Sequence, residues 1–179
     1  MNHDTYSDDY IAGILADHKR FAFVGASANS SRPSYFAMKY LTSKGYTVIP
    51  VNPSITGQEI LGQKVVAHLS DAPGPIEVID IFRSADAVLG VVREAINLKD
   101  KLGLKVIWLQ LGVRNDEAAA EAEAAGLKVV MNRCPKIEYG RLSGEIGWAG
   151  VNSRTLSSAR GKLGDKGVQN RRMTVRKPV

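Results

Sequence analysis

The sequence predicts an α/β fold in which a mostly parallel sheet is covered by helices on both faces. Short apolar runs without a helical period, the first at residues 21–24, alternate along the chain with longer amphipathic segments. Chains that alternate in this way build parallel sheets with right-handed crossovers. The length of 179 residues and the apolar content of 44% suit one sizeable core. We therefore expect a single doubly wound domain.

Six segments are expected to form strands, because each is a short apolar run bounded by glycine, proline or polar residues. They are residues 21–24, 46–51, 64–66, 76–82, 105–110 and 127–131. The expected helices begin at a capping residue or a proline, and most end before a glycine. They are one that follows Ser7, then residues 33–44, 84–102 and 115–125.

The segment that joins the first strand to its helix has the character of a phosphate-binding loop. Gly25 and Ala26 let the backbone turn sharply and leave room for a ligand to approach main-chain N–H groups. Pro33 suits the first helical position, and the helix N-terminus directs positive partial charge at the loop. Arg32 adds a guanidinium that can bind phosphate bidentately. A single glycine also fits an ordinary turn, so this loop alone leaves both interpretations open.

Loops from five strand ends are expected to meet at one edge of the sheet. In open parallel sheets the ligand lies at the carboxyl ends of the strands, near the point where the strand order reverses. The five loops are residues 25–32, 52–53, 82–83, 110–112 and 132–134. Their convergence favours a nucleotide-binding edge.

The end of the second strand separates the candidate nucleotides. An NAD site needs an acidic residue there to bind the ribose hydroxyls, and an NADP site is served by an arginine. This chain has Asn52 and Pro53 instead, and its first acidic residue after the strand is Glu59. An NAD(P)-binding oxidoreductase is therefore an alternative that the residues at this position disfavour.

Composition limits the classes of protein that fit. No apolar run approaches the roughly 20 residues that span a bilayer, and the N-terminus is polar and acidic rather than secretory. The single cysteine, Cys134, excludes an internal disulfide and a cysteine-based zinc site. We therefore expect a cytoplasmic protein without a membrane segment or a metal centre.

Six short motifs lie in order along the chain. They are Phe-Val-Gly-Ala-Ser at 23–27, Ser-Arg-Pro at 31–33, Gly-Tyr-Thr-Val-Ile-Pro-Val-Asn-Pro at 45–53, Val-Ile-Asp-Ile-Phe-Arg at 78–83, Ile-Trp-Leu-Gln-Leu-Gly at 107–112 and Met-Asn-Arg-Cys-Pro at 131–135. Together they resemble the small single-domain CoA-binding proteins and the N-terminal CoA-binding domain of the succinyl-CoA synthetase α subunit. The resemblance covers roughly residues 10–142. It implies a Rossmann-like fold of five to six strands in the order 3-2-1-4-5-6, with residues 64–66 as the third strand.

The resemblance also implies which residues contact coenzyme A. Those expected at its pyrophosphate or 3′-phosphate are Gly25, Ala26, Ser27 and Arg32. Those expected near the adenosine half are Asn52 and Pro53, and those bordering the middle of the ligand are Phe82 and Arg83. Those expected along the pantetheine, toward the thiol, are Gln110, Gly112, Asn132 and Cys134.

The residues favour a binding protein over an enzyme. The related ligases need a phosphorylatable histidine on a second domain, but no histidine follows residue 142 here. The family usually has Glu-His shortly after the cysteine, where this chain has Glu138 and Tyr139. No Ser-His-Asp order or supported carboxylate pair is evident, so we name no catalytic residue. We expect the chain to sense, store or deliver CoA or an acyl-CoA.

Cys134 has two interpretations. Near the pantetheine end it could form a mixed disulfide with the CoA thiol by thiolate exchange. It could also be a small packed residue at a strand end, as free cysteines usually are. The sequence leaves both open.

All of the net charge of +6 lies in residues 143–179, where eight Lys and Arg stand against two acidic residues. We therefore divide the chain into a CoA-binding domain at 1–142 and a basic, glycine- and arginine-rich extension at 143–179. One interpretation is that the extension is a solvated segment, part of which docks on the body or on a second subunit of a homodimer. The other is that it is an adaptor for nucleic acid or acidic partners. Apart from Trp148, it lacks the interleaved aromatic residues that stack on bases, which argues against nucleic acid.

Overall fold

The computed structural model describes residues 1–145. The chain forms two compact units. One unit is His18–Cys134, which contains the whole parallel sheet, and the other joins Met1–Asp17 to the chain from Pro135 onward. Almost all of the predicted basic extension lies outside the described residues, and the predicted division at residue 142 stays a prediction.

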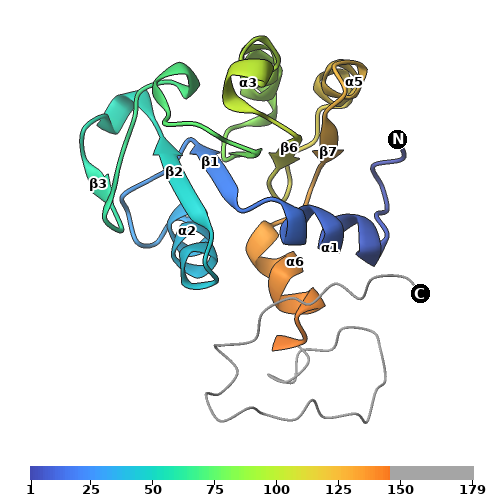
Figure 1. The fold of residues 1–179 in the computed structure, drawn as a ribbon, viewed down its shortest axis with the longest axis horizontal. Coiled ribbons are helices and arrows are strands. Elements are labelled where there is room, and N and C mark those ends of the chain that lie inside the picture. Colours follow the sequence, from blue (N-terminus) through green and yellow to red (C-terminus); the bar gives the residue numbers. More distant parts are fainter. Residues whose placement is uncertain (146–179) are drawn as a thin grey trace. The chain divides into compact units, whose positions relative to one another are not determined.

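A parallel five-stranded sheet forms the centre of the unit His18–Cys134 (Figure 1). Its strands are β1 (Arg20–Val24), β2 (Thr47–Val51), β5 (Val78–Ile81), β6 (Val106–Leu109) and β7 (Lys128–Val130). They lie in the order β2-β1-β5-β6-β7, and every adjacent pair is parallel. Most of their residues are buried, as in parallel sheets covered on both faces, which explains apolar runs without alternation. The predicted α/β, Rossmann-like fold is confirmed.

The predicted third strand is reduced to one residue. A separate antiparallel hairpin forms from β3 (Glu59–Ile60) and β4 (Gln63–Lys64), and its turn places Leu61 at φ 51° and Gly62 at φ 76°. Two consecutive residues with positive φ are typical of the tightest hairpin turns. Val66 alone meets the main sheet, through a parallel bridge to Val51. The predicted strand order is retained, but a strand over 64–66 is wrong, because the turn draws residue 64 into the hairpin.

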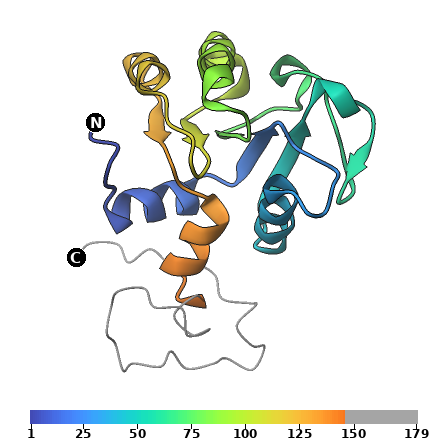
Figure 2. The same cartoon turned by 180° about the vertical axis from the view of Figure 1, so that it is seen from behind.

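Crossover helices cover the two faces of this sheet. One face carries α2 (Pro33–Ser43), and α3 (Ala85–Asn97) and α5 (Asp116–Ala124) lie side by side on the opposite face (Figure 1 and Figure 2). The predicted helix over 84–102 is interrupted at Leu98, where ψ is 1°, and continues as the short α4 (Lys99–Leu102). Gly103, at φ 71°, then ends it as predicted. Asn115 caps α5, because its Oδ1 accepts from Ala118 N at 2.9 Å.

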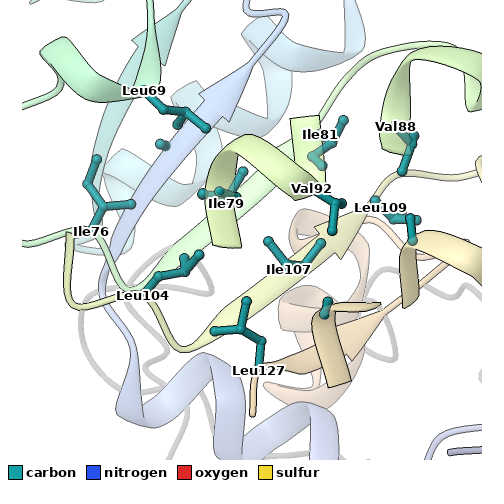
Figure 3. Close-up of a cluster of buried hydrophobic side chains, with 14 of the residues drawn as sticks. Leu69, Ile76, Ile79, Ile81, Val88, Val92, Leu104, Ile107, Leu109 and Leu127 are labelled. Atoms are coloured by element: carbon teal, nitrogen blue, oxygen red, sulfur yellow. The ribbon is translucent and has the colours of Figure 1, made fainter. Parts of the chain in front are cut away.

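A continuous apolar core lies between the sheet and the two helices α3 and α5 (Figure 3). Ile79, Ile107 and Leu109 of the central strands pack in the same cluster as Val88 and Val92 of α3. From α5 the cluster receives only alanines, which are short enough for that helix to lie near the strands. Each large side chain buried here stabilises the fold by about 1.5–3 kcal/mol.

The other unit pairs two helices, α1 (Asp8–Asp17) and α6 (Pro135–Leu142). Arg141 joins them, because its Nη1 lies 2.7 Å from Asp8 Oδ1 and its Nη2 donates to Glu138 Oε2 at 2.8 Å. The helix predicted after Ser7 is confirmed as α1. The predicted helices do not include α6, since residues 136–142 show no clear apolar period. Within residues 1–145, no helix has the length and apolar content needed to cross a bilayer.

Candidate functional site

Gly25 brings the loop after β1 against the chain that follows β5. Its φ of 86° lies in the region that favours glycine, and its N–H donates to Val51 O of β2 at 2.9 Å. A Cβ on Gly25 would lie 2.6 Å from Phe82 O and 2.9 Å from Arg83 Cδ. A side chain does not fit here, so the approach of three strand ends depends on this glycine.

Hydrogen bonds inside the loop fix its path toward α2. Ser27 N–H donates to Ser34 Oγ at 3.1 Å, and Ser27 Oγ accepts from Asn29 N at 3.2 Å. Arg32 occupies the N-cap position of α2 in an extended conformation and makes no side-chain cap. The loop therefore leads into the helix through a residue whose guanidinium is not used to cap it.

Two exposed arginines flank this loop. The Cδ of Arg83 lies against Gly25, and Arg32 stands at the start of α2. Within residues 1–145, neither guanidinium has an ion pair or a hydrogen-bond acceptor, in contrast to Arg93 and Arg141, which bind carboxylates. A guanidinium without a protein acceptor suits a phosphate, because its planar fork can form two parallel hydrogen bonds.

Asn52 joins the end of β2 to the same loop. Its Nδ2 donates to Ala26 O at 2.8 Å. Its Oδ1 accepts from Ser54 N at 3.0 Å and so caps the short 3₁₀ helix Pro53–Ile55. Both ends of the Asn52 amide are thus engaged with the backbone, and the side chain positions the loop. Pro53 is exposed beside it.

Phe82 presents its backbone rather than its ring to Gly25. The Phe82 ring packs on Phe23 of β1, with ring centroids 4.8 Å apart. Its N–H donates to Val24 O at 2.8 Å and its carbonyl oxygen is the atom nearest a Cβ on Gly25. This predicted site residue therefore shapes the edge through its main chain.

The ends of β6 and β7 are joined by Gly112 and Asn132. Asn132 Oδ1 accepts from Gly112 N at 2.8 Å, and Asn132 itself has φ 52°, a conformation that asparagine tolerates better than most residues. Gln110 directly follows β6 and is buried, and Cys134 is half-buried. The mixed disulfide between Cys134 and CoA stays a prediction.

Asp80, on β5, lies next to the predicted site residues, and it was not among them although it belongs to the motif at 78–83. It is fully buried, and Gln110 Nε2 donates to its two oxygens at 2.9 and 2.8 Å. Burial raises the pKa of Asp80 well above its usual value, and the hydrogen bond from Gln110 acts in the opposite direction. The signal in the sequence is a carboxylate in the middle of an otherwise apolar strand.

The predicted site residues include two groups that direct contacts connect. The first group is Gly25, Ala26, Asn52, Phe82 and Arg83. The second group is Gly112 and Asn132. Both lie where parallel strands end, at one edge of the sheet. Within residues 1–145, no group of three or more His, Cys, Asp or Glu is placed to hold a metal ion.

A family model described as the CoA binding domain matches residues 19–140. The chain belongs to the CoA-binding domain family. The matched range contains all five strands of the parallel sheet and every site residue named above. The resemblance carried by the six sequence motifs is thereby confirmed.

The chain is also similar to proteins of known sequence and structure. The chain is 36% identical to YneT of Bacillus subtilis (strain 168) over 129 residues, which are 72% of this chain and 91% of YneT. It is 40% identical to a hypothetical protein from Pyrococcus horikoshii OT3, with a TM-score of 0.71 over 79% of this chain and 96% of that one. It is also similar to the dinucleotide-forming acetyl-coenzyme A synthetase 1 of Ca. Korarchaeum cryptofilum, solved with phosphate and ADP. That match has 27% identity and a TM-score of 0.55, over 70% of this chain and 28% of the synthetase.

Proposed function

We propose that this chain binds coenzyme A or an acyl-CoA at the carboxyl edge of its sheet and acts without catalysis, by sensing, storing or delivering the ligand. The observation that carries the proposal is the pair of exposed guanidiniums, Arg32 and Arg83, beside the Gly25 loop of a CoA-binding domain. CoA has a pyrophosphate and a 3′-phosphate, so two cations without protein acceptors match its charge.

The rest of the edge offers groups of the right kind for the other parts of CoA. In this proposal the phosphates are held by Gly25, Ala26, Ser27 and Arg32. The adenosine half lies near Asn52 and Pro53, and the middle of the ligand near Phe82 and Arg83. The pantetheine follows Gln110, Gly112, Asn132 and Cys134. The neutral Asn52 supports this arrangement, because a carboxylate at that position would repel a phosphorylated ribose.

A binding role without catalysis is supported by the part of the synthetase that this chain matches. The match covers 28% of that enzyme, so most of the synthetase lies outside it. Where the family usually has Glu-His, this chain has Glu138 and Tyr139, and the Glu138 carboxylate is bound by Arg141. A glutamate engaged in this way is poorly suited to accept a proton from a substrate.

The proposal also covers the protein's cellular location, the division of its chain and its oligomeric state. A reducing cytoplasm is supported by one cysteine in 179 residues. We also propose that residues 1–142 bind CoA, that residues 143–179 are a basic extension, and that two copies form a homodimer. Light scattering of the full chain with and without CoA measures the assembly.

Thermal unfolding with a series of ligands tests CoA binding directly. CoA at about 100 times its dissociation constant should stabilise the chain by about 2.7 kcal/mol, which raises the Tm by several degrees. The shift should shrink with dephospho-CoA and be absent with NAD. A shift with NAD or NADP and none with CoA would contradict the proposal and support the oxidoreductase alternative.

Replacement of Arg32 separates a phosphate contact from a general loss of charge. Arg32→Ala should weaken CoA binding at least about tenfold, because a hydrogen bond to a charged group contributes about 1.5–3 kcal/mol. Arg93→Ala is the matched control, since Arg93 is also exposed but pairs with Glu117 and Glu121 across α3 and α5. Isothermal calorimetry should find CoA affinity unchanged in Arg93→Ala. Equal losses in both variants would show only an effect of net charge.

A further inference from the structure

Asp80 occupies a position where a carboxyl group is costly. It lies on β5, the central strand of the sheet, in register with Phe23 of β1 and Trp108 of β6. All three side chains are fully buried. Moving a carboxyl group from water into such surroundings costs several kcal/mol unless hydrogen bonds or ion pairs compensate.

The compensation at Asp80 comes from an amide and not from a cation. Gln110 Nε2 lies 2.9 Å from Asp80 Oδ1 and 2.8 Å from Oδ2. Within residues 1–145, no lysine, arginine or histidine pairs with this carboxyl group. A pair of this kind contributes little net stability, since an apolar pair of the same shape would avoid the cost of burial. The consequence of these hydrogen bonds is that Asp80 holds the Gln110 amide in one orientation.

The orientation decides which group of Gln110 is offered at the edge of the sheet. With Nε2 directed at Asp80, the carbonyl oxygen Oε1 is left as a hydrogen-bond acceptor, and no donor within residues 1–145 pairs with it. Ionised or neutral, Asp80 keeps an oxygen that can accept from Nε2. Gln110 follows β6 at the carboxyl end, where β1, β2 and β5 also end.

We propose that Asp80 is a positioning residue for the ligand site, which fixes Gln110 so that its Oε1 accepts a hydrogen bond from an amide N–H of the ligand's pantetheine arm. The proposal rests on the proposed function, because it assumes CoA at this edge. It assigns Gln110 to the recognition of one chemical feature, an N–H donor, and gives the buried carboxyl of Asp80 a role in ligand selection.

Adenosine 3′,5′-bisphosphate makes the proposal testable, because it carries the nucleotide and 3′-phosphate of CoA but no pantetheine arm. Asp80→Leu should weaken CoA binding about fivefold, the value of one lost hydrogen bond, and leave bisphosphate binding unchanged. This single variant leaves Gln110 Nε2 without its acceptor and should lower the Tm, whereas the double variant Asp80→Leu/Gln110→Leu, in which both partners are apolar, should recover stability without recovering CoA affinity. A purely structural residue would not separate affinity from stability in this way.

Two further variants complete the calorimetry. In a Gln110→Leu background, Asp80→Leu should change CoA affinity by less than about twofold, because both substitutions remove the same contact. Ile81→Val, a packing change on the same strand, should lower the Tm while leaving the ratio of CoA to bisphosphate affinity unchanged. Unaltered CoA binding in Asp80→Leu, or equal weakening of both ligands, would overturn the proposal.

The wild-type chain provides a measurement that does not depend on a variant that folds. In a nitrogen-15-labelled sample, the side-chain amide protons of Gln110 should exchange with water much more slowly than those of the exposed Gln58. CoA should shift the Gln110 amide resonance and the bisphosphate should not. Exchange as fast as that of Gln58, or no shift with bound CoA, rejects the positioning role. A wild-type chain that binds neither ligand would instead reject the proposed function.

Discussion

At the amino ends of β1 and β5, Lys19, Arg20 and Glu77 are bound by backbone groups or by a tyrosine hydroxyl. Beyond the carboxyl ends of the same strands, Arg32 and Arg83 have no acceptor within residues 1–145. At the amino ends, Glu77 Oε2 accepts from the N–H groups of Lys19 and Arg20 at 2.8 and 3.1 Å. Arg20 Nε donates to Pro75 O at 2.6 Å, and Lys19 Nζ donates to the Tyr46 hydroxyl at 3.0 Å. Because these three side chains are already hydrogen-bonded within the protein, they are poorly placed to bind a ligand.

At the carboxyl ends, backbone contacts fix the loops after β1, β2 and β5, while Arg32 and Arg83 are left without an acceptor in the part of the chain that the structure describes. Asn52 holds Ala26, and Gly25 lies against Phe82, so the main chain is fixed. Within the described residues, the guanidiniums of Arg32 and Arg83 still have no acceptor. The two ends of β1 and β5 therefore differ in what they can offer an anionic ligand, because Lys19 and Arg20 are bound within the protein while Arg32 and Arg83 are available.

The largest expected effect comes from placing a side chain where the carboxyl-end loops meet. Gly25→Ala should lower the free energy of unfolding by about 3 kcal/mol, because it adds left-handed backbone strain and a Cβ 2.6 Å from Phe82 O. It should also abolish the CoA-dependent rise in Tm. Urea unfolding measures the first effect and thermal unfolding with CoA the second.

Gly57→Ala is the matched control for strain alone. Gly57 has a similar φ of 82°, but a Cβ there would meet nothing within 4 Å. Its cost should be about 1–2 kcal/mol, with CoA binding retained. If the two variants lose the same stability and the same affinity, the close approach at Gly25 does not organise the site.

A smaller effect is expected when the contact from β2 to the loop is made acidic. Asn52→Asp removes the donor to Ala26 O, which should cost about 1 kcal/mol of stability, and it places a negative charge beside the proposed phosphate site. CoA affinity should fall about fivefold or more, most strongly at low salt. Asn97→Asp, at the exposed C-terminal end of α3, controls for the added charge and should leave CoA affinity unchanged.

The smallest effect belongs to the amino ends and depends on pH. Burial alone would raise the pKa of Glu77, but the N–H groups of Lys19 and Arg20, together with the neighbouring His18, outweigh it and lower the pKa below its usual value. Glu77 therefore stabilises the fold above that value, and the contribution is lost as the pH falls through the lowered pKa. Glu77→Gln should cost about 1 kcal/mol at pH 7 and almost nothing near pH 3, by urea unfolding.

CoA affinity at pH 7 should be unchanged in Glu77→Gln, because the residue lies at the amino end of the strands. Glu59→Gln, which changes an exposed carboxylate, should shift the unfolding free energy by less than about 0.5 kcal/mol. A loss of CoA binding in Glu77→Gln would mean that the two edges are energetically coupled and that the contrast between them is false.

Much of the fold could be predicted because each buried strand of the main sheet is a run of apolar residues in the sequence. The apolar runs predicted all five strands of the main sheet, Pro33 and Gly45 predicted α2, and Asn115 and Gly126 predicted α5. The hairpin turn at Leu61 could not be predicted, because nothing in the local sequence indicates that a leucine adopts a positive φ there. The stop at Leu98 was equally hidden, because a leucine has no helix-ending property of its own.

The sequence predicted which loops form the site, but it did not predict the hydrogen bonds that connect them. Glycine, arginine and asparagine at strand ends indicated where a ligand fits. The sequence could not show that the Asn52 side-chain amide donates to Ala26 O, or that Gln110 Nε2 donates to Asp80. Those pairs join residues 26 and 30 positions apart, and their geometry depends on how neighbouring strands align.

The single bridge between Val51 and Val66 limits how copies of this protein can assemble. Val66 N–H donates to Pro50 O at 3.0 Å and its carbonyl accepts from Asn52 N at 2.9 Å, while Pro50 has no N–H to offer. The outer side of β2 is therefore a poor template for a strand from another molecule, in solution or in an aggregate. A homodimer of this chain is therefore not expected to continue the sheet through β2.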